Sequence, residues 1–112
     1  MSLPDLTTFA SHRAVTDAAF EGVEVPGLTA EFFRRPAGDR IATVGRYSRD
    51  GRELLMAWGF VDEAHCRHWA ARDPDGNWHP AADGCPVVQV LRDADAVVGL
   101  AIQTPDGAWI TA

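Results

Sequence analysis

The sequence predicts an α+β fold in which two helices pack on one face of a single twisted or curved antiparallel sheet, in the order helix-βββ-helix-βββ. Three observations predict it. Apolar and polar residues alternate in segments after residue 28 and again after residue 87. Short Gly- and Pro-containing turns separate these segments. Two other segments carry apolar residues at helical spacing. A length of 112 residues fits one α+β domain spanning 1–112.

The first predicted helix runs from Thr7 to Phe20. Asp5 or one of the neighbouring threonines can cap its start. Arg13 and Asp17 are four residues apart, so on a helix they would face each other. Gly22 follows the segment and is expected to end it.

Three strands joined by short turns are then predicted, at residues 28–33, 41–47 and 54–60. Asp50-Gly51 is a typical hairpin turn between the second and the third. Alternation in the third strand predicts one buried apolar face made of Leu54, Met56, Trp58 and Phe60.

The second predicted helix begins at Asp62 and ends near Arg72. Its inner stripe would consist of Val61, Ala64, His65 and Trp69. The polar loop that follows, Asp73 to Pro86, is long for a small domain and is therefore a candidate for function.

The last part of the chain predicts three more strands, at residues 87–91, 96–102 and 109–111. Pro105-Asp106-Gly107 is a turn sequence before the final strand. A sheet curled around a pocket is the structural alternative to a flat sheet covered by helices.

Charge limits the classes of partner. The net charge is −6 and the pI about 5.0, which argues against nucleic acid and anionic membranes and suits a protein partner with a basic surface. All ten basic residues are arginine, so chemistry that requires lysine is excluded. Six arginines between residues 34 and 52 are expected to form a solvated face paired with acidic neighbours.

The chain start has no basic, apolar leader pattern, and no apolar run reaches the roughly 20 residues of a membrane helix. We therefore expect a cytoplasmic protein. Cys66 and Cys85 would then be reduced thiols, whereas export would allow them to form a disulfide.

Histidines and cysteines are concentrated between residues 65 and 85. Residues of these types bind zinc, and the candidate ligands are His65, His68, His79 and Cys85. Their spacing matches no standard zinc pattern, so we expect no metal and no cofactor. A Cys66 nucleophile is a further alternative, but its helical neighbours would not face it.

The four tryptophans of this short chain are a second group of candidate binding residues. Trp58 is expected in the core and Trp69 beneath the second helix. Trp78 lies in the polar loop without an obvious core partner, and Trp109 lies on a possible edge strand. Tryptophan is enriched at binding hot spots.

Two functions follow as expectations. The first is a non-catalytic protein-binding or inhibitory module, similar in size and charge to immunity proteins, secretion chaperones and phage or plasmid inhibitors, and able to dimerise through an edge strand. Its contact surface would be loop 73–86 with the strand ending at Trp109. The second is a small-molecule-binding domain or enzyme, metal-assisted or not, with a pocket lined by Trp58, His65, His68 and His79.

Overall fold

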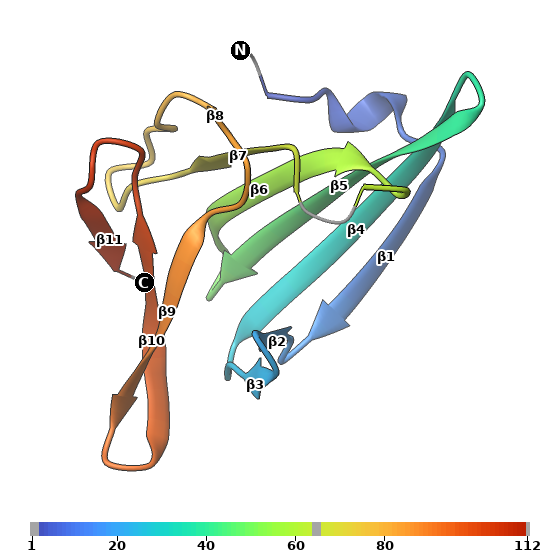
Figure 1. The fold of residues 1–112 in the computed structure, drawn as a ribbon. Helices are drawn as coiled ribbons and strands as arrows, with labels where there is room; N and C mark the ends of the chain where they lie inside the picture. The colour runs from blue at the N-terminus through green and yellow to red at the C-terminus, as the bar shows by residue number, and fades with distance from the viewer. Residues whose placement is uncertain (1–2, 64–65, 112) are drawn as a thin grey trace.

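The computed structural model describes residues 3–63 and 66–111 and is built from antiparallel β-strands (Figure 1). The larger sheet has the strand order β1-β4-β5-β6-β7-β8, and a second sheet has the order β11-β10-β9. The strands of the larger sheet are β1 (Ser11–Thr16), β4 (Leu28–Ala37), β5 (Arg40–Arg49), β6 (Arg52–Phe60), β7 (His68–Ala71) and β8 (Ala82–Asp83). Those of the second sheet are β9 (Val87–Asp93), β10 (Ala96–Gln103) and β11 (Trp109–Thr111), and a separate hairpin consists of β2 (Ala19–Phe20) and β3 (Val23–Glu24).

The predicted α+β class is therefore wrong. Among the described residues the only helical element is η1 (Leu6–Thr8), one 3-10 turn, and no helices pack on either sheet. None of the helical structure described is long and apolar enough to cross a membrane. The sequence also predicts one sheet, whereas the strands of the described residues form three: the six-stranded larger sheet, the three-stranded second sheet and the β2–β3 hairpin.

The first predicted helix is instead η1 followed by β1 and β2. Asp5 caps the short turn, because its carboxylate accepts a hydrogen bond of 3.0 Å from the Thr7 backbone N–H. All six residues of β1 are exposed, since this strand forms one edge of the sheet. An edge strand exposed on both faces has no alternating burial, so its sequence carries no period-two signal.

The second predicted helix is also wrong where the structure describes it, because His68–Ala71 form β7. Trp69, Ala70 and Ala71 are all buried, although consecutive residues of a strand point to opposite faces. A strand buried on both faces reads as a continuous apolar run, and alanine favours helices locally. Ala64 and His65 lie outside the described residues.

The predicted strands of the first half are confirmed as β4, β5 and β6, paired as an antiparallel meander. Those of the second half are confirmed as β9, β10 and β11. Asp50 and Gly51 both have positive φ, 53° and 79°, as expected for the turn of a tight hairpin.

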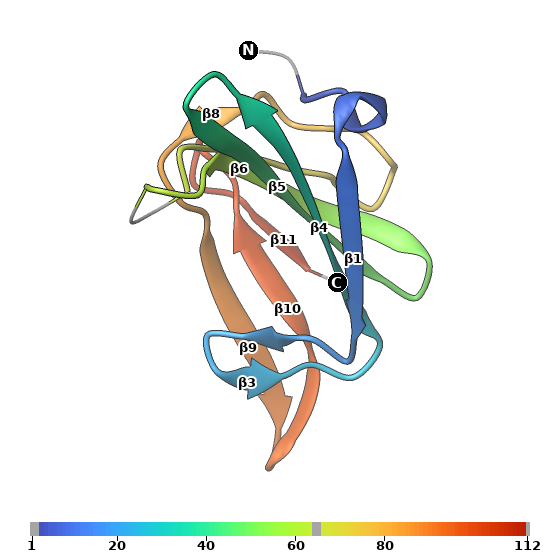
Figure 2. The ribbon, with the colours of Figure 1, turned by 90° about the vertical axis from the view of Figure 1, so that its right-hand side faces the viewer.

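The core lies between the two sheets (Figures 1 and 2). The larger sheet contributes Leu28, Ala30, Leu55 and Trp69 to it. The second sheet contributes Val88, Leu100, Ile102 and Ile110. Burying an aliphatic side chain of this size stabilises the fold by roughly 1.5–3 kcal/mol.

A β-bulge in β6 changes the expected side-chain pattern. Tyr47 pairs with Leu55, but the next residue, Ser48, pairs with Glu53, so Leu54 is the extra residue. Leu54 and Leu55 are both buried in the core. After the bulge, Trp58 lies on the opposite face of the sheet from Leu55. The prediction that Trp58 belongs to the core face is therefore wrong.

Candidate functional site

The larger sheet carries a groove on its outer face, the face turned away from the second sheet. Its volume is about 540 Å³. The residues that line it are Pro4, Phe9, Arg35, Arg40, Ala42, Thr43, Val44, Trp58, Gly59, Phe60, Glu63, Arg67 and His68. Binding sites for small molecules usually measure about 300–1,000 Å³, so the groove has a suitable size.

The floor of the groove lies on a cross-strand line that runs through all six strands. Each residue of this line pairs directly with the next, in the order His12, Phe33, Val44, Trp58, His68, Asp83. The rings of Trp58 and His68 have centroids 5.9 Å apart. The line places aromatic and imidazole groups side by side on one face.

The chain segment before β1 forms one side of the groove. Phe9 packs edge-on against Phe33, with ring centroids 6.3 Å apart. The Arg35 guanidinium lies 4.9 Å from the Phe9 ring centroid, and its Nη1 donates a hydrogen bond of 2.7 Å to Thr8 Oγ1. Arg35 therefore ties this segment to the sheet.

Arg40 forms part of the groove wall and already has partners. Its guanidinium lies 3.8 Å from the Phe60 ring centroid. It also forms ion pairs with Asp62 at 3.0 Å and Glu63 at 3.3 Å. The hydrogen bond from Arg40 lowers the pKa of Asp62.

The Glu63 carboxylate lies beside Gly59, in space that the side chain of any other residue at position 59 would occupy. A Cβ atom at Gly59 would lie 2.7 Å from Glu63 Oε2 and 3.0 Å from Arg67 Cβ. The same carboxylate oxygen accepts a hydrogen bond of 3.3 Å from the Phe60 backbone N–H. Glu63 is thus held by Arg40 and by the backbone, and Gly59 provides the space it occupies.

Arg67 differs from Arg40, because its guanidinium has no ion pair or hydrogen bond with any residue in the described ranges. A planar guanidinium is suited to binding a carboxylate, sulfonate or phosphate through two hydrogen bonds. Arg67 is therefore the cation in the groove wall best placed to bind an anion.

His68 is oriented by Asp83. Its Nδ1 lies 2.9 Å from Asp83 Oδ1, which leaves Nε2 as the ring nitrogen that can meet a ligand. The His68 side chain is 24% exposed, whereas the Asp83 side chain is 83% exposed. When the ring is protonated both nitrogens donate, one to Asp83 and the other to an anion.

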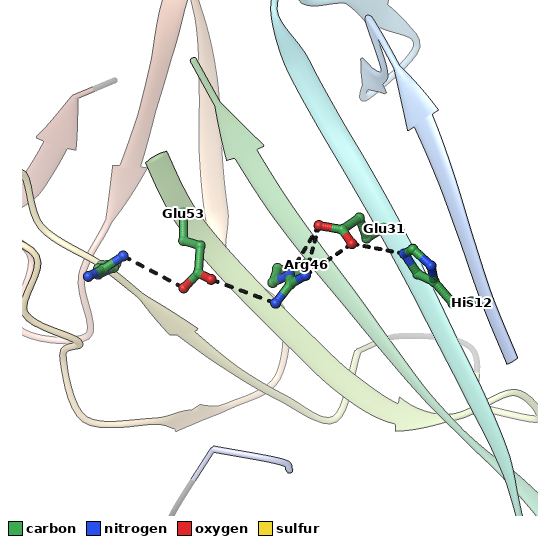
Figure 3. Close-up of polar contacts among 5 residues, drawn as sticks. His12, Glu31, Arg46 and Glu53 are labelled. Carbon is green, nitrogen blue, oxygen red and sulfur yellow. Dashed lines mark hydrogen bonds and ion pairs between the residues drawn. The ribbon is translucent and has the colours of Figure 1, made fainter. Parts of the chain in front are cut away.

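A ladder of alternating charges crosses the same outer face (Figure 3). It joins His12 to Glu31 at 2.8 Å, Glu31 to Arg46 at 2.9 Å, Arg46 to Glu53 at 3.6 Å and Glu53 to Arg72 at 3.7 Å. The hydrogen bonds from Arg46 are the main cause of a lowered pKa of Glu31. Arg46 is thus neutralised by acidic neighbours, as the sequence predicted for this group of arginines.

Two smaller hollows are lined mainly by residues of the larger sheet. Their volumes are about 370 and 340 Å³, and they share Phe32, Arg34 and Thr43. The Arg13 guanidinium stacks 5.6 Å from the Phe32 ring centroid beside them. Two of the residues considered for a site from the sequence, Trp58 and Cys66, line the second of these hollows.

The structure separates the other predicted site residues from the groove. The ring of Trp78 is half-buried, with the Arg72 guanidinium 6.0 Å away. His79 Nε2 lies 3.3 Å from Asp73 Oδ2. Trp109 is 44% exposed on β11, the edge of the second sheet. His65 lies outside the described residues.

The proposed metal residues do not form a ligand set in the parts of the chain that the structure describes. No group of three or more His, Cys, Asp or Glu side chains there is arranged to hold a metal ion. His68 and His79 have separate carboxylate partners, Asp83 and Asp73. Cys85 lies against Cys66 instead.

Cys66 does not resemble an activated nucleophile. Burial is the largest cause, and the neighbouring Cys85 the second, of a pKa raised to about 11. A thiol with such a pKa is almost entirely protonated at neutral pH. No histidine in the described ranges forms a hydrogen bond with its sulfur.

Sequence reasoning missed Phe9, Arg40, Phe60 and Arg67 as groove residues. One signal was present for Phe60: the pair Leu54-Leu55 interrupts the alternation, which is typical of a bulge. No local signal connects Phe9 with Phe60, since only the fold brings these distant segments to one groove.

No protein family, curated protein or solved structure was found to match this chain. The geometry of the groove is therefore the basis for a functional assignment.

Proposed function

We propose that this protein is a non-catalytic binding module whose outer-face groove takes a small organic anion with a flat apolar body. One observation carries the proposal: Trp58 and Phe60 lie in the same 540 Å³ groove as Arg67, whose guanidinium has no acidic partner among the described residues. The aromatic residues offer a surface for stacking, and the arginine offers two hydrogen bonds to an acidic group.

The charges of the groove support an anionic ligand. Arg35, Arg40, Arg67 and His68 line it, whereas Glu63 is the only carboxylate among the described residues of the lining. The whole chain carries a net charge of −6, so this basic lining is a local feature and not a reflection of the composition. A cleft lined by one sign of charge attracts ligands of the opposite sign.

The test uses two fluorescent probes that differ in charge. Anilinonaphthalene sulfonate has an aromatic body and a sulfonate, whereas N-phenyl naphthylamine has a similar body without the acid. We expect the folded protein to bind the sulfonate at one site. Arg67→Gln should weaken that binding about tenfold or more, because a charge-assisted hydrogen bond contributes roughly 1.5–3 kcal/mol.

The matched control is Arg92→Gln, which removes an exposed arginine of β9 in the other sheet. It should leave the affinity for the sulfonate unchanged, and neither variant should alter binding of the neutral probe by more than about twofold. Equal losses in both variants, or an unchanged affinity in Arg67→Gln, would contradict the proposal.

A protein partner with a basic surface is the second candidate, and one observation favours it. Val87 and Trp109 are 53% and 44% exposed, and both pair with Gln103, so they lie on one face of the second sheet. Exposed Asp83 and Asp106 belong to the neighbouring segments. A large exposed aromatic residue beside acidic groups suits a partner of opposite charge.

Trp109→Ser tests this candidate, with Val98→Ser as the control at an equally exposed residue of β10. A partner retained by the wild type and the control, and released by Trp109→Ser and by raised salt, would support it. Retention by Trp109→Ser would contradict it. Sedimentation of the same variants tests whether the partner is a second copy, since β11 is an edge strand that can pair between subunits.

We also propose that the protein works in the cytoplasm. The two free thiols support this location. Fractionation of cells that express the full chain with its natural start would test it, and recovery in an exported fraction would contradict it.

A further inference from the structure

The two cysteines of the chain face each other across the end of the β7–β8 ladder. His68 pairs with Asp83 in this ladder, and the Gly84 backbone N–H donates a hydrogen bond of 2.9 Å to the Arg67 carbonyl. The next pair along the same register is Cys66 and Cys85. The Cys66 backbone N–H donates to Cys85 Sγ at 2.9 Å, which confirms that the two residues are neighbours.

Their arrangement suits a disulfide. Directly opposed residues of an antiparallel pair have Cα atoms about 4.5–5.5 Å apart, and a disulfide requires about 4.4–6.8 Å. Cys85 Sγ also lies 3.7 Å from the Cys66 carbonyl oxygen, so this sulfur sits directly over the Cys66 backbone. The two side chains also interact with each other, since a hydrogen bond with Cys85 is among the causes of the raised pKa of Cys66.

We propose that Cys66 and Cys85 form a reversible intramolecular disulfide when a hydroperoxide oxidises the protein. Cys85 is the first thiol to react, because it is the exposed one and a peroxide can reach its sulfur. Cys66 is half-buried and is the resolving thiol.

The oxidation proceeds in two steps. The Cys85 thiolate attacks the terminal oxygen of the hydroperoxide and the O–O bond breaks. Cys85 becomes a sulfenic acid, and the other oxygen leaves as an alkoxide or hydroxide that takes up a proton from water, so the peroxide is reduced by two electrons. The Cys66 sulfur then attacks the Cys85 sulfur, and the sulfenic hydroxyl leaves with the Cys66 proton as water. A dithiol reductant returns the same two electrons and restores both thiols.

The different settings of the two sulfurs support this order. Burial and the adjacent Cys85 raise the pKa of Cys66 to about 11, so Cys66 remains a thiol at neutral pH and reacts slowly with peroxide. The bridge would join residues 19 apart in the sequence, and closing such a loop in the unfolded chain should raise the Tm by about 10–15 °C.

The experiment treats the reduced full-length protein with hydrogen peroxide and follows its intact mass and free thiols. We expect a loss of two hydrogen atoms per monomer, loss of both thiols and full reversal by dithiothreitol. The native protein should form the bridge at least about tenfold faster than the protein unfolded in urea, because the fold holds the thiols together. Equal rates would overturn the proposal.

Two variants test the order of reaction. Cys66→Ser should accumulate a sulfenic acid at Cys85 that dimedone traps, whereas Cys85→Ser should react with peroxide at least about tenfold more slowly. Circular dichroism of each variant checks that it remains folded. Disulfide-linked dimers, sulfinic acid at Cys85 in the wild type, or a sulfenic acid that forms first at Cys66 would each overturn the inference.

Discussion

Trp58 and His68 lie directly opposite each other on β6 and β7, with their ring centroids 5.9 Å apart and an angle of 38° between the ring planes. The pairing joins an apolar surface to a group that can form hydrogen bonds. Asp83 then fixes the imidazole through Nδ1. Substitutions at Trp58 and His68 therefore test the apolar surface of the groove and its hydrogen-bonding group.

We predict that Trp58→Ala weakens binding of anilinonaphthalene sulfonate and of the neutral probe alike, by about tenfold, because both lose the stacking surface. Trp58→Phe should recover most of that loss. His68→Gln should weaken only the sulfonate. Fluorescence titration measures all three, and a Trp58→Ala variant that binds both probes normally would place the site elsewhere.

Gly59→Ala should destabilise the protein by about 1–3 kcal/mol, because the added methyl group would overlap the Glu63 carboxylate. Urea unfolding gives the free energy. The matched comparison is Gly59→Ala in a Glu63→Ala background, where the carboxylate is gone and the cost should shrink to the remaining contact with Arg67 Cβ. If the losses of unfolding free energy caused by Gly59→Ala and Glu63→Ala simply add in the double variant, residue 59 and the Glu63 carboxylate do not interact.

The charge ladder predicts a dependence of stability on pH. Hydrogen bonds from Arg46 lower the pKa of Glu31 in the folded state, so this contribution is present above the unfolded pKa of about 4.3 and is lost as pH falls through the lowered folded value. Glu31→Gln should therefore be less stable than the wild type at neutral pH, and the difference should narrow below about pH 4. Urea unfolding measures the stability of both proteins across this pH range. A stability difference between the wild type and Glu31→Gln that stays constant with pH would contradict the role given to Glu31.

Because the core lies between the sheets, two residues of the same strand should differ in how much they contribute to stability. Leu100 is 1% exposed and Val98 is 50% exposed, although both belong to β10. Leu100→Ala should reduce the free energy of unfolding by about 2–5 kcal/mol, whereas Val98→Ala should change it by less than about 0.5 kcal/mol. Equal costs at the two positions would show that the second sheet does not pack on the first.

The sequence predicted the strands that have one buried face, and it failed for those that do not. Alternation identified β4 and β10, and Asp50-Gly51 identified the turn between β5 and β6. β1 is exposed on both faces and β7 is buried on both, so neither shows period two. Both were read as helices, because spacing alone does not separate a short mixed segment from a helix.

The candidate site was predicted less well than the strands. Trp58 and His68 were both named from the sequence, but as members of a group with His65 and His79. Their pairing depends on the register of β6 and β7, which is a long-range property. The extra residue at Leu54 breaks the alternation between Leu54 and Trp58, and no composition or spacing rule for the whole strand contains that information.

The bulge at Leu54 divides β6 into two parts that obey opposite rules of substitution. A saturation scan of this strand would find that Leu54 and Leu55 both require apolar residues, although consecutive residues of a regular strand face opposite sides of the sheet. Loss of that single residue would restore a regular ladder with Trp58 still opposite Val44, so the indole would keep its outward face while the core lost one leucine. One inserted residue thereby supplies the interior with two consecutive leucine side chains without moving the indole out of the groove.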